Sequence, residues 1–235
     1  MKILIPMAGE GIRFVKRGYF SPKPLILING KPMIERVIES LNLNHQYIFL
    51  VRSTSFELQR LLSKITEDKA TIVDVVHCTE GAACTALLAK EFIDNDEELL
   101  IANSDQIVHY DVDKFNKMKG NTGLDGIIFT FTATDPKWSF VQADKDGRIY
   151  NVEEKNPISN IATCGVYWYR KGSDFVSAAE TMIENKIKTN NEFYIAPAYN
   201  EMIKIGKNIS AFFVDEMHGV GTPEDLEAYC ANHFS

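Results

Sequence analysis

Short apolar runs alternate with amphipathic segments through the first half of the chain. The amphipathic segments carry apolar residues three and four positions apart, which is the spacing of a helix with one buried face. This pattern predicts strands over 2–7, 47–51, 71–76 and 98–102 and helices over 32–43, 53–65 and 82–93, with Ser/Thr caps opening the second helix. Strands and helices in alternation imply right-handed crossovers, so we expect an α/β fold with a mostly parallel sheet flanked by helices.

The second half of the chain has a different pattern, in which several strand-like runs follow one another before a helix appears. An Asp-Lys-Asp-Gly turn at 144–147 is typical of a hairpin. The expected strands are 126–133, 139–143, 148–153, 161–169 and 209–214, and the expected helices are 173–185, 194–205 and 223–232. We therefore expect one domain over 1–235, in which a small antiparallel insertion follows the parallel part.

Composition places the chain among ordinary globular proteins. Its 235 residues are 45% hydrophobic and 24% charged. The four cysteines are scattered without a C-x-x-C pair, which argues against a disulfide framework and a structural zinc site. No apolar run approaches a membrane span, and the first residues lack the pattern of a signal peptide, so we expect a cytoplasmic protein without a membrane partner.

Charge is distributed unevenly along the chain. The formal net charge of −7 argues against a nucleic-acid partner bound through a basic face. Residues 1–31 nevertheless hold six basic side chains and one acid, a net of +5, which leaves −12 for the remainder. The positive charge gathers in 5–25, IPMAGEGIRFVKRGYFSPKPL, and predicts an anionic ligand there.

The glycines of this segment do not form one of the common nucleotide-binding motifs. A Rossmann fingerprint would need a third glycine where Phe14 stands, and a P-loop would need serine or threonine where Pro32 follows Lys31. Another arrangement could hold phosphate. Backbone N–H groups of 8–11 can face phosphate oxygens, Arg13 offers a fork of donors, and Lys23 is held between two prolines.

Eight motifs along nearly the whole chain resemble those of the nucleoside-triphosphate (sugar-phosphate) nucleotidyltransferases, in the order of that family. The sequences of these motifs look closest to those of enzymes of capsule and surface-polysaccharide synthesis. The motifs are 7–14 (MAGEGIRF), 22–25 (PKPL), 30–34 (GKPMI), 80–85 (EGAACT), 103–105 (NSD), 152–155 (VEEK), 162–167 (ATCGVY) and 221–225 (GTPED). The resemblance implies a GT-A-like, Rossmann-like fold, with a nucleotide-binding half over 1–125 and an acceptor-binding half over 126–235.

The resemblance also implies roles for individual residues. Arg13 would bind the triphosphate and stabilise the departing pyrophosphate, Lys23 would hold the α-phosphate and the acceptor phosphate, and Asp105 would bind Mg²⁺. Nucleotide contacts would come from Met7, Ala8, Gly9, Glu10, Gly11, Glu80, Gly81, Ala82 and Ser104. Acceptor contacts would come from Glu154, Lys155 and Gly165. The nucleotide is expected to be CTP, and the resemblance allows a homo-oligomer.

Three departures from the family pattern affect the metal and the acceptor. Gly219 stands where sugar-activating relatives carry a second metal-binding Asp, so either Asp105 suffices or Asp215 or His218 takes that place. Phe140 stands where glycine is common, and Asn156 interrupts the family's E-K-P. The acceptor is therefore left open between a hexose 1-phosphate and a smaller phosphoamide or phosphoalcohol such as phosphoglutamine.

Two functions from other classes remain as alternatives. A regulatory protein could keep the fold and bind nucleotide without catalysis. A GT-A glycosyltransferase would share the fold but needs a D-x-D motif, and the sequence Asp105-Gln106-Ile107 offers only the first acid.

Overall fold

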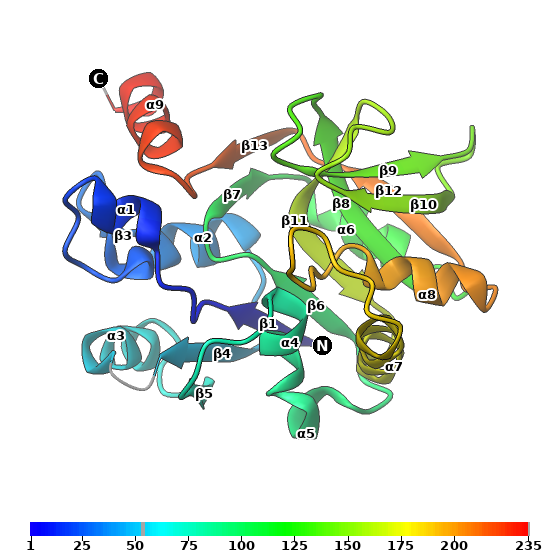
Figure 1. The fold of residues 1–235 in the computed structure, drawn as a ribbon, viewed down its shortest axis with the longest axis horizontal. Helices are drawn as coiled ribbons and strands as arrows, with labels where there is room; N and C mark the ends of the chain where they lie inside the picture. Colours follow the sequence, from blue (N-terminus) through cyan, green and yellow to red (C-terminus); the bar gives the residue numbers. More distant parts are fainter. Residues whose placement is uncertain (53–54, 235) are drawn as a thin grey trace.

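The computed structural model describes residues 1–52 and 55–234 and contains a large mixed sheet with helices on both faces (Figure 1). The strand order is β10-β9-β11-β6-β1-β4-β5, and β8 and β12 extend the sheet from β11. The strands are β1 (Lys2–Pro6), β4 (Gln46–Arg52), β5 (Thr71–Val75), β6 (Leu99–Ala102), β8 (Gly126–Thr132), β9 (Ser139–Ala143), β10 (Ile149–Glu154), β11 (Ile161–Tyr169) and β12 (Ile209–Phe213).

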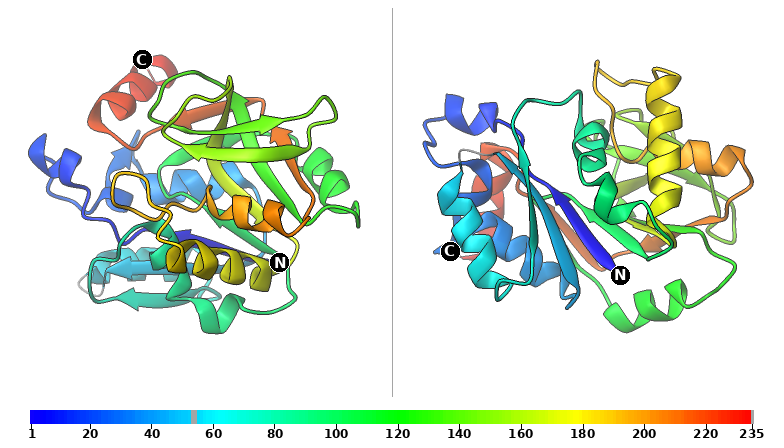
Figure 2. Two further views of the ribbon diagram at one scale, coloured as in Figure 1. Left: turned by 45° about the vertical axis from the view of Figure 1, so that its right-hand side comes forward. Right: turned by 90° about the horizontal axis from the view of Figure 1, so that it is seen from below.

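Helices cover both faces because both faces of the central strands are apolar. Ile3 and Ile5 of β1 belong to one hydrophobic cluster and Leu4 to another, as the two-residue period of a strand requires. Figure 2 (right) shows α2 and α3 on one side of the parallel strands and α4 and α7 on the other. The helices are α1 (Ile12–Lys16), α2 (Met33–Leu41), α3 (Phe56–Ile65), α4 (Ala82–Leu87), α5 (Lys90–Ile93), α6 (Val112–Lys119), α7 (Gly172–Glu184), α8 (Ala198–Lys204) and α9 (Pro223–His233), with a 3₁₀ turn η1 (Lys23–Leu25).

Strand β11 joins the two halves of the sheet. It pairs antiparallel with β6 of the parallel half and with β8 and β9 of the second half. Strands β1, β4, β5 and β6 are parallel to their neighbours within the first half. The expected α/β fold, with parallel strands followed by an antiparallel part, is confirmed.

Two short ribbons lie outside this sheet. One pairs β2 (Leu27–Ile28) with β3 (Lys31–Pro32), and the other pairs β7 (Gln106–His109) with β13 (Glu216–Gly219). The β7–β13 ribbon joins segments that are over 100 residues apart: β7 follows β6, and β13 runs beside it in the opposite direction and leads to α9 (Figure 1).

Three of the expected helices divide or begin later than expected, and the sequence predicts neither α1 nor α6. The helix expected over 82–93 divides into α4 and α5, because the N–H groups of Leu88 and Ala89 bond to carbonyls three residues back and tighten the chain. The helix expected over 194–205 begins only at Ala198, after Pro197, which has no N–H to donate. Helix α3 begins at Phe56. Of the expected caps, Ser53 and Thr54 lie outside the described residues, and the Ser55 side chain makes no capping hydrogen bond.

None of the helices in the described part of the chain combines the length and apolar character that a membrane span needs.

Candidate active site

Two adjoining cavities open at the carboxyl ends of β1 and β6, the edge where open α/β sheets hold their ligands. The glycine-loop cavity has a volume of about 570 Å³ and is lined by the loop after β1 and by the segment before α4. The sheet-edge cavity has a volume of about 600 Å³ and is lined by the end of β6, the antiparallel strands and the turn before α9. Each volume is within the range of small-molecule sites.

The two cavities share one wall, and this wall contains two of the expected catalytic residues. Both Arg13 and Lys23 line both cavities, so an anion in either cavity would meet the same two cations. The residues common to the two linings are Pro6, Arg13, Lys23, Ala82, Ser104, Tyr194 and Gly221.

Asp105, the third expected catalytic residue, lies on the sheet-edge side and forms an ion pair with Lys23. Both side chains are partly exposed to the cavity, at 19% for Lys23 and 25% for Asp105. The turn before α9 closes over this pair at Gly221, where an added Cβ would lie 2.6 Å from Asp105 Oδ2 and 3.5 Å from Lys23 Nζ. A side chain at this position would displace the Asp105 carboxylate from its present place.

The loop after β1 contributes a row of residues to the glycine-loop cavity. These are Met7, Ala8, Gly9, Glu10 and Gly11, and all of them line it. The loop ends in α1, which carries Arg13.

The outer end of this loop is held by an ion pair. Glu10 accepts a hydrogen bond from Arg52 at the end of β4 (2.8 Å), and Arg52 also contacts Cys78 Sγ at 3.3 Å. The loop residues expected to contact the nucleotide therefore line the glycine-loop cavity, and Arg52 of β4 anchors the loop at Glu10.

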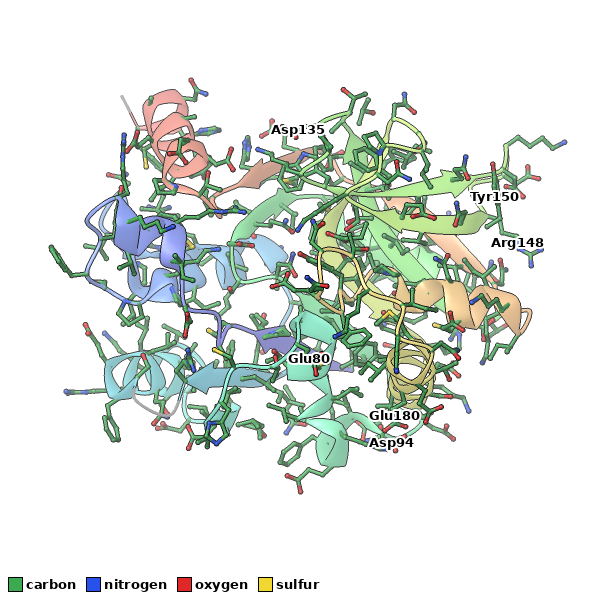
Figure 3. All side chains as sticks on the ribbon, viewed as in Figure 1. Glu80, Asp94, Asp135, Arg148, Tyr150 and Glu180 are labelled. Carbon is green, nitrogen blue, oxygen red and sulfur yellow. The ribbon has the colours of Figure 1, made fainter. Side chains whose placement is uncertain are left out.

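The second group of expected nucleotide contacts precedes α4. Gly81 and Ala82 line the glycine-loop cavity, but Glu80 lines neither cavity and pairs with Lys188 instead. Figure 3 labels Glu80 beside α4. The Phe193 backbone clamps this segment, since its N–H donates to the Glu80 carbonyl at 2.8 Å and its carbonyl accepts from Ala83 at 3.0 Å.

Gly81→Ala is expected to destabilise the protein by about 2–4 kcal/mol, because strain and a backbone clash combine. Gly81 has φ +129°, and a Cβ there would lie 2.5 Å from the Phe193 carbonyl oxygen. Urea unfolding measures the loss. Gly9→Ala is the matched control, since no atom lies within 4 Å of its added Cβ. Equal stability of the two variants would contradict the clamp.

The expected acceptor contacts gather on the other side of the shared wall. Glu154, Lys155 and Gly165 all line the sheet-edge cavity. Lys155 Nζ donates to the Tyr194 hydroxyl at 2.5 Å, and the Gly165 carbonyl accepts from the Asn103 N–H at 2.9 Å. The second hydrogen bond ties β11 to the end of β6, immediately before Ser104 and Asp105.

Glu154 is a buried residue of this lining, and its carboxylate accepts a hydrogen bond from the Ser139 hydroxyl. Burial raises the pKa of the Glu154 carboxyl, with Ser139 and Lys155 opposing the change. The pKa of Glu154 is thus higher in the folded than in the unfolded state. Its contribution to the free energy of unfolding is therefore full below the unfolded-state pKa and is lost as pH rises through the folded-state pKa.

Glu154→Gln removes this titration, so the stability of the variant relative to wild type is expected to increase as pH rises from about 4.5 toward 8. Urea unfolding of both proteins across this range measures the difference. A difference that is constant with pH would show that Glu154 does not titrate differently in the folded state.

The structure gives a reason why position 219 holds glycine, where the family pattern has a second metal-binding acid. An added Cβ would lie 2.8 Å from the indole ring of Trp138, so Trp138 fills the space that an Asp side chain would need. Neither Asp215 nor His218 lines the cavity. Asp225 does line it, but its carboxylate pairs with Lys137 at 2.8 Å.

The other two departures lie away from the cavities. Phe140 is fully buried in the core, and its neighbour Ser139 is the residue that lines the sheet-edge cavity. Asn156 lines neither cavity. Lys137 and Trp138, which directly precede Ser139, do line the sheet-edge cavity.

Several lining residues were not expected from the sequence. Tyr194 lies on the shared wall, yet the apolar spacing assigned it to a helix. Its hydroxyl donates to Glu192 at 2.5 Å, and burial raises its pKa. Gly221 belongs to the GTPED motif, which could have indicated it. No sequence signal indicates Trp138.

Comparisons with known proteins identify the family of this chain. The nucleotidyl transferase family model matches residues 2–232. The bifunctional protein GlmU of Methanocaldococcus jannaschii is 25% identical over 96% of this chain and 52% of that protein. The mannose-1-phosphate guanylyltransferase catalytic subunit beta of Danio rerio is 30% identical over 71% of this chain and 49% of that protein. The chain thus spans about half the length of these curated relatives.

Among solved structures, a nucleoside-diphosphate-sugar pyrophosphorylase from Vibrio cholerae superposes with a TM-score of 0.84 at 25% identity. The match covers 97% of this chain and 99% of that one. The expected family resemblance is confirmed, although nothing in these matches is specific to capsule synthesis. Since the family model matches nearly every residue, the chain belongs to the nucleotidyl transferase family.

Proposed function

We propose that the protein transfers a nucleotidyl group from a nucleoside triphosphate to a phosphorylated acceptor and releases pyrophosphate. The observation that carries this proposal is the wall shared by the two cavities, because Arg13 and Lys23 face both of them. A reaction between two polyanions needs positive charge where they meet. Arg13 and Lys23 would supply that charge from the wall between the two cavities.

The proposed step is an in-line displacement. An oxygen of the acceptor phosphate attacks the α-phosphorus, a new P–O bond forms, and the bond to the β-phosphate oxygen breaks as pyrophosphate leaves. No protein nucleophile is needed. Arg13 would bind the triphosphate and stabilise the pyrophosphate, while Lys23 would hold the α-phosphate against the acceptor phosphate.

The nucleotide is proposed to occupy the glycine-loop cavity, and CTP is the nucleotide that the protein is proposed to prefer. The backbone of residues 7–11 would meet the phosphates, and Gly81, Ala82 and Ser104 would lie along the nucleotide. The preference for CTP rests on the resemblance of residues 80–85 to the base loop of the family. The guanylyltransferase relative makes GTP the nucleotide to compare first.

The acceptor is proposed to occupy the sheet-edge cavity, where Lys155 would bind its phosphate and Glu154 and Gly165 would contact the rest. Its class is a hexose 1-phosphate or a smaller phosphoamide or phosphoalcohol such as phosphoglutamine. The product would be an activated precursor for capsule or other surface polysaccharide. Trp138 lines this cavity and lies against Gly219, where the family pattern has an acid in sugar-activating enzymes.

Mg²⁺ is the proposed cofactor, and the donor set fits one protein carboxylate for it. Asp105 offers a hard oxygen ligand beside the shared wall, and Mg²⁺ commonly takes its other ligands from water and substrate phosphate. When bound, the ion would neutralise charge on the phosphates. Asp105 would then hold the ion in place of Lys23, and Lys23 would be available to contact phosphate.

We also propose that residues 1–235 act as one domain, with 1–125 supplying the nucleotide-binding half and 126–235 the acceptor-binding half. Support comes from β11, which pairs with strands of both halves. The shared wall likewise draws Lys23 from the first half and Gly221 from the second.

The decisive test combines five nucleoside triphosphates with a panel of phosphorylated acceptors in the presence of Mg²⁺. Pyrophosphate release with one pair, together with the corresponding nucleotide-linked product by mass spectrometry, is the expected result. Nucleotide binding without pyrophosphate release from any pair would favour a regulatory protein. Transfer of a sugar from a nucleotide sugar would favour a glycosyltransferase. Either outcome would overturn the proposal.

A further inference from the structure

Three metal-ligating side chains come together on the β7–β13 ribbon, away from both cavities. His109, Glu216 and His218 each offer one ligand atom, and these atoms lie within 4.8 Å of one another. None of the three lines the glycine-loop cavity or the sheet-edge cavity. The cluster is therefore separate from the proposed active site.

The register of the ribbon places these side chains on one face. Glu216 pairs directly with His109 across the two antiparallel strands, and His218 pairs with Ile107. Directly opposed residues point to the same side of a ribbon, as do residues two apart on one strand. Pairing of β13 with β7 thus brings the two imidazoles and the carboxylate together.

Two of the three side chains are exposed, and Glu216 and His218 already contact neighbouring groups. Glu216 and His109 are exposed and His218 is half-buried. Glu216 Oε2 lies 3.2 Å from His218 Nε2, and the His218 ring packs against Tyr229 and His233 at centroid distances of 5.1 and 4.6 Å. An ion could reach the cluster without unfolding any element.

We propose that His109, Glu216 and His218 form a binding site for a divalent transition-metal ion of the zinc class. Imidazole nitrogen and carboxylate oxygen are the ligands that Zn²⁺, Co²⁺ and Ni²⁺ share, whereas Mg²⁺ prefers oxygen. Bonds of about 2.0–2.2 Å place tetrahedral ligands roughly 3.4 Å apart. Small rotations of the exposed side chains close the remaining distance, and water completes the coordination.

An ion here would join two strands that also position the proposed active site. Strand β7 starts directly after Asp105, and β13 ends two residues before Gly221. The Val220 N–H donates to the Asp105 carbonyl at 2.9 Å at the cavity end of the same ribbon. The ion would link segments that are over 100 residues apart, so it would stabilise the folded state by mass action.

The site is tested by titrating the 235-residue protein with Co²⁺ and Zn²⁺ at pH 7.5 in excess Mg²⁺. Co²⁺ absorption bands report imidazole and carboxylate ligation, and calorimetry gives the stoichiometry and Kd of Zn²⁺. We expect one ion per chain and a Tm increase of about 5–10 °C at a hundredfold excess over Kd. His109→Ala and His218→Ala should each weaken binding at least about tenfold, since even outer-shell changes cost that much.

Three control variants separate this site from other metal-binding groups. His233→Gln changes a neighbouring ring outside the ligand set, Cys78→Ser removes an exposed thiol, and Asp105→Asn removes the proposed Mg²⁺ ligand. All three should retain Zn²⁺ binding. The proposal is overturned if the wild type binds no ion, if His109→Ala and His218→Ala both bind as the wild type does, or if Asp105→Asn abolishes binding. Pyrophosphate-release assays are not involved, so failure here leaves the proposed function unaffected.

Discussion

Lys23→Ala is expected to lower kcat by at least about a hundredfold, the loss typical of a removed transition-state contact. Lys23 lines both cavities, so its charge is available to the triphosphate and to the acceptor phosphate as charge develops between them. Pro22 and Pro24 fix the backbone around it, and Pro24 is buried. The backbone that carries Lys23 is therefore fixed before substrates bind, and its ammonium group starts from the pair with Asp105.

The measurement is steady-state pyrophosphate release, with circular dichroism to show that the variant is folded. Lys16→Ala is the matched control, because Lys16 is an exposed lysine of the same segment that lines neither cavity. Lys23→Arg keeps the charge but changes its geometry, so it should have intermediate activity. A folded Lys23→Ala variant with nearly normal kcat would remove Lys23 from the mechanism.

Much of the parallel half of the fold could be predicted because its signals are local. Strands such as β1 and β6 are short runs buried on both faces, and α2 has a clear apolar stripe. The β7–β13 ribbon could not be predicted in this way. Its strands are four residues long and partly polar, and they pair across more than 100 residues, so no local periodicity marks them.

The residues of the candidate site likewise divide into those that the sequence predicts and those that it does not. Arg13, Lys23 and Asp105 could be named from the sequence because charge, proline spacing and motif order mark them. Tyr194 could not, since its place on the shared wall depends on how the chain approaches Pro197 and α8. The contact between Trp138 and Gly219 depends on backbone positions in two distant segments, and no residue pattern encodes it.

Asp105→Asn is expected to lower turnover by at least about a hundredfold, and it should raise the Mg²⁺ concentration needed for half-maximal rate. The amide keeps the shape of the carboxylate but loses the charge that attracts a divalent cation. No second carboxylate can compensate at position 219, because the space beside Gly219 is filled by Trp138. The single substitution should therefore remove the main protein ligand of the ion.

Asp225→Asn is the matched control, because Asp225 lines the same cavity and is likewise paired with a lysine, Lys137. We expect less than about a tenfold loss there, without a change in Mg²⁺ dependence. A double-mutant cycle with Lys23→Ala adds a further check, since residues that form one ion pair should show non-additive losses in kcat. Equal Mg²⁺ curves for wild type and Asp105→Asn would show that the ion is held elsewhere. Strictly additive losses would show that Lys23 and Asp105 act on separate steps.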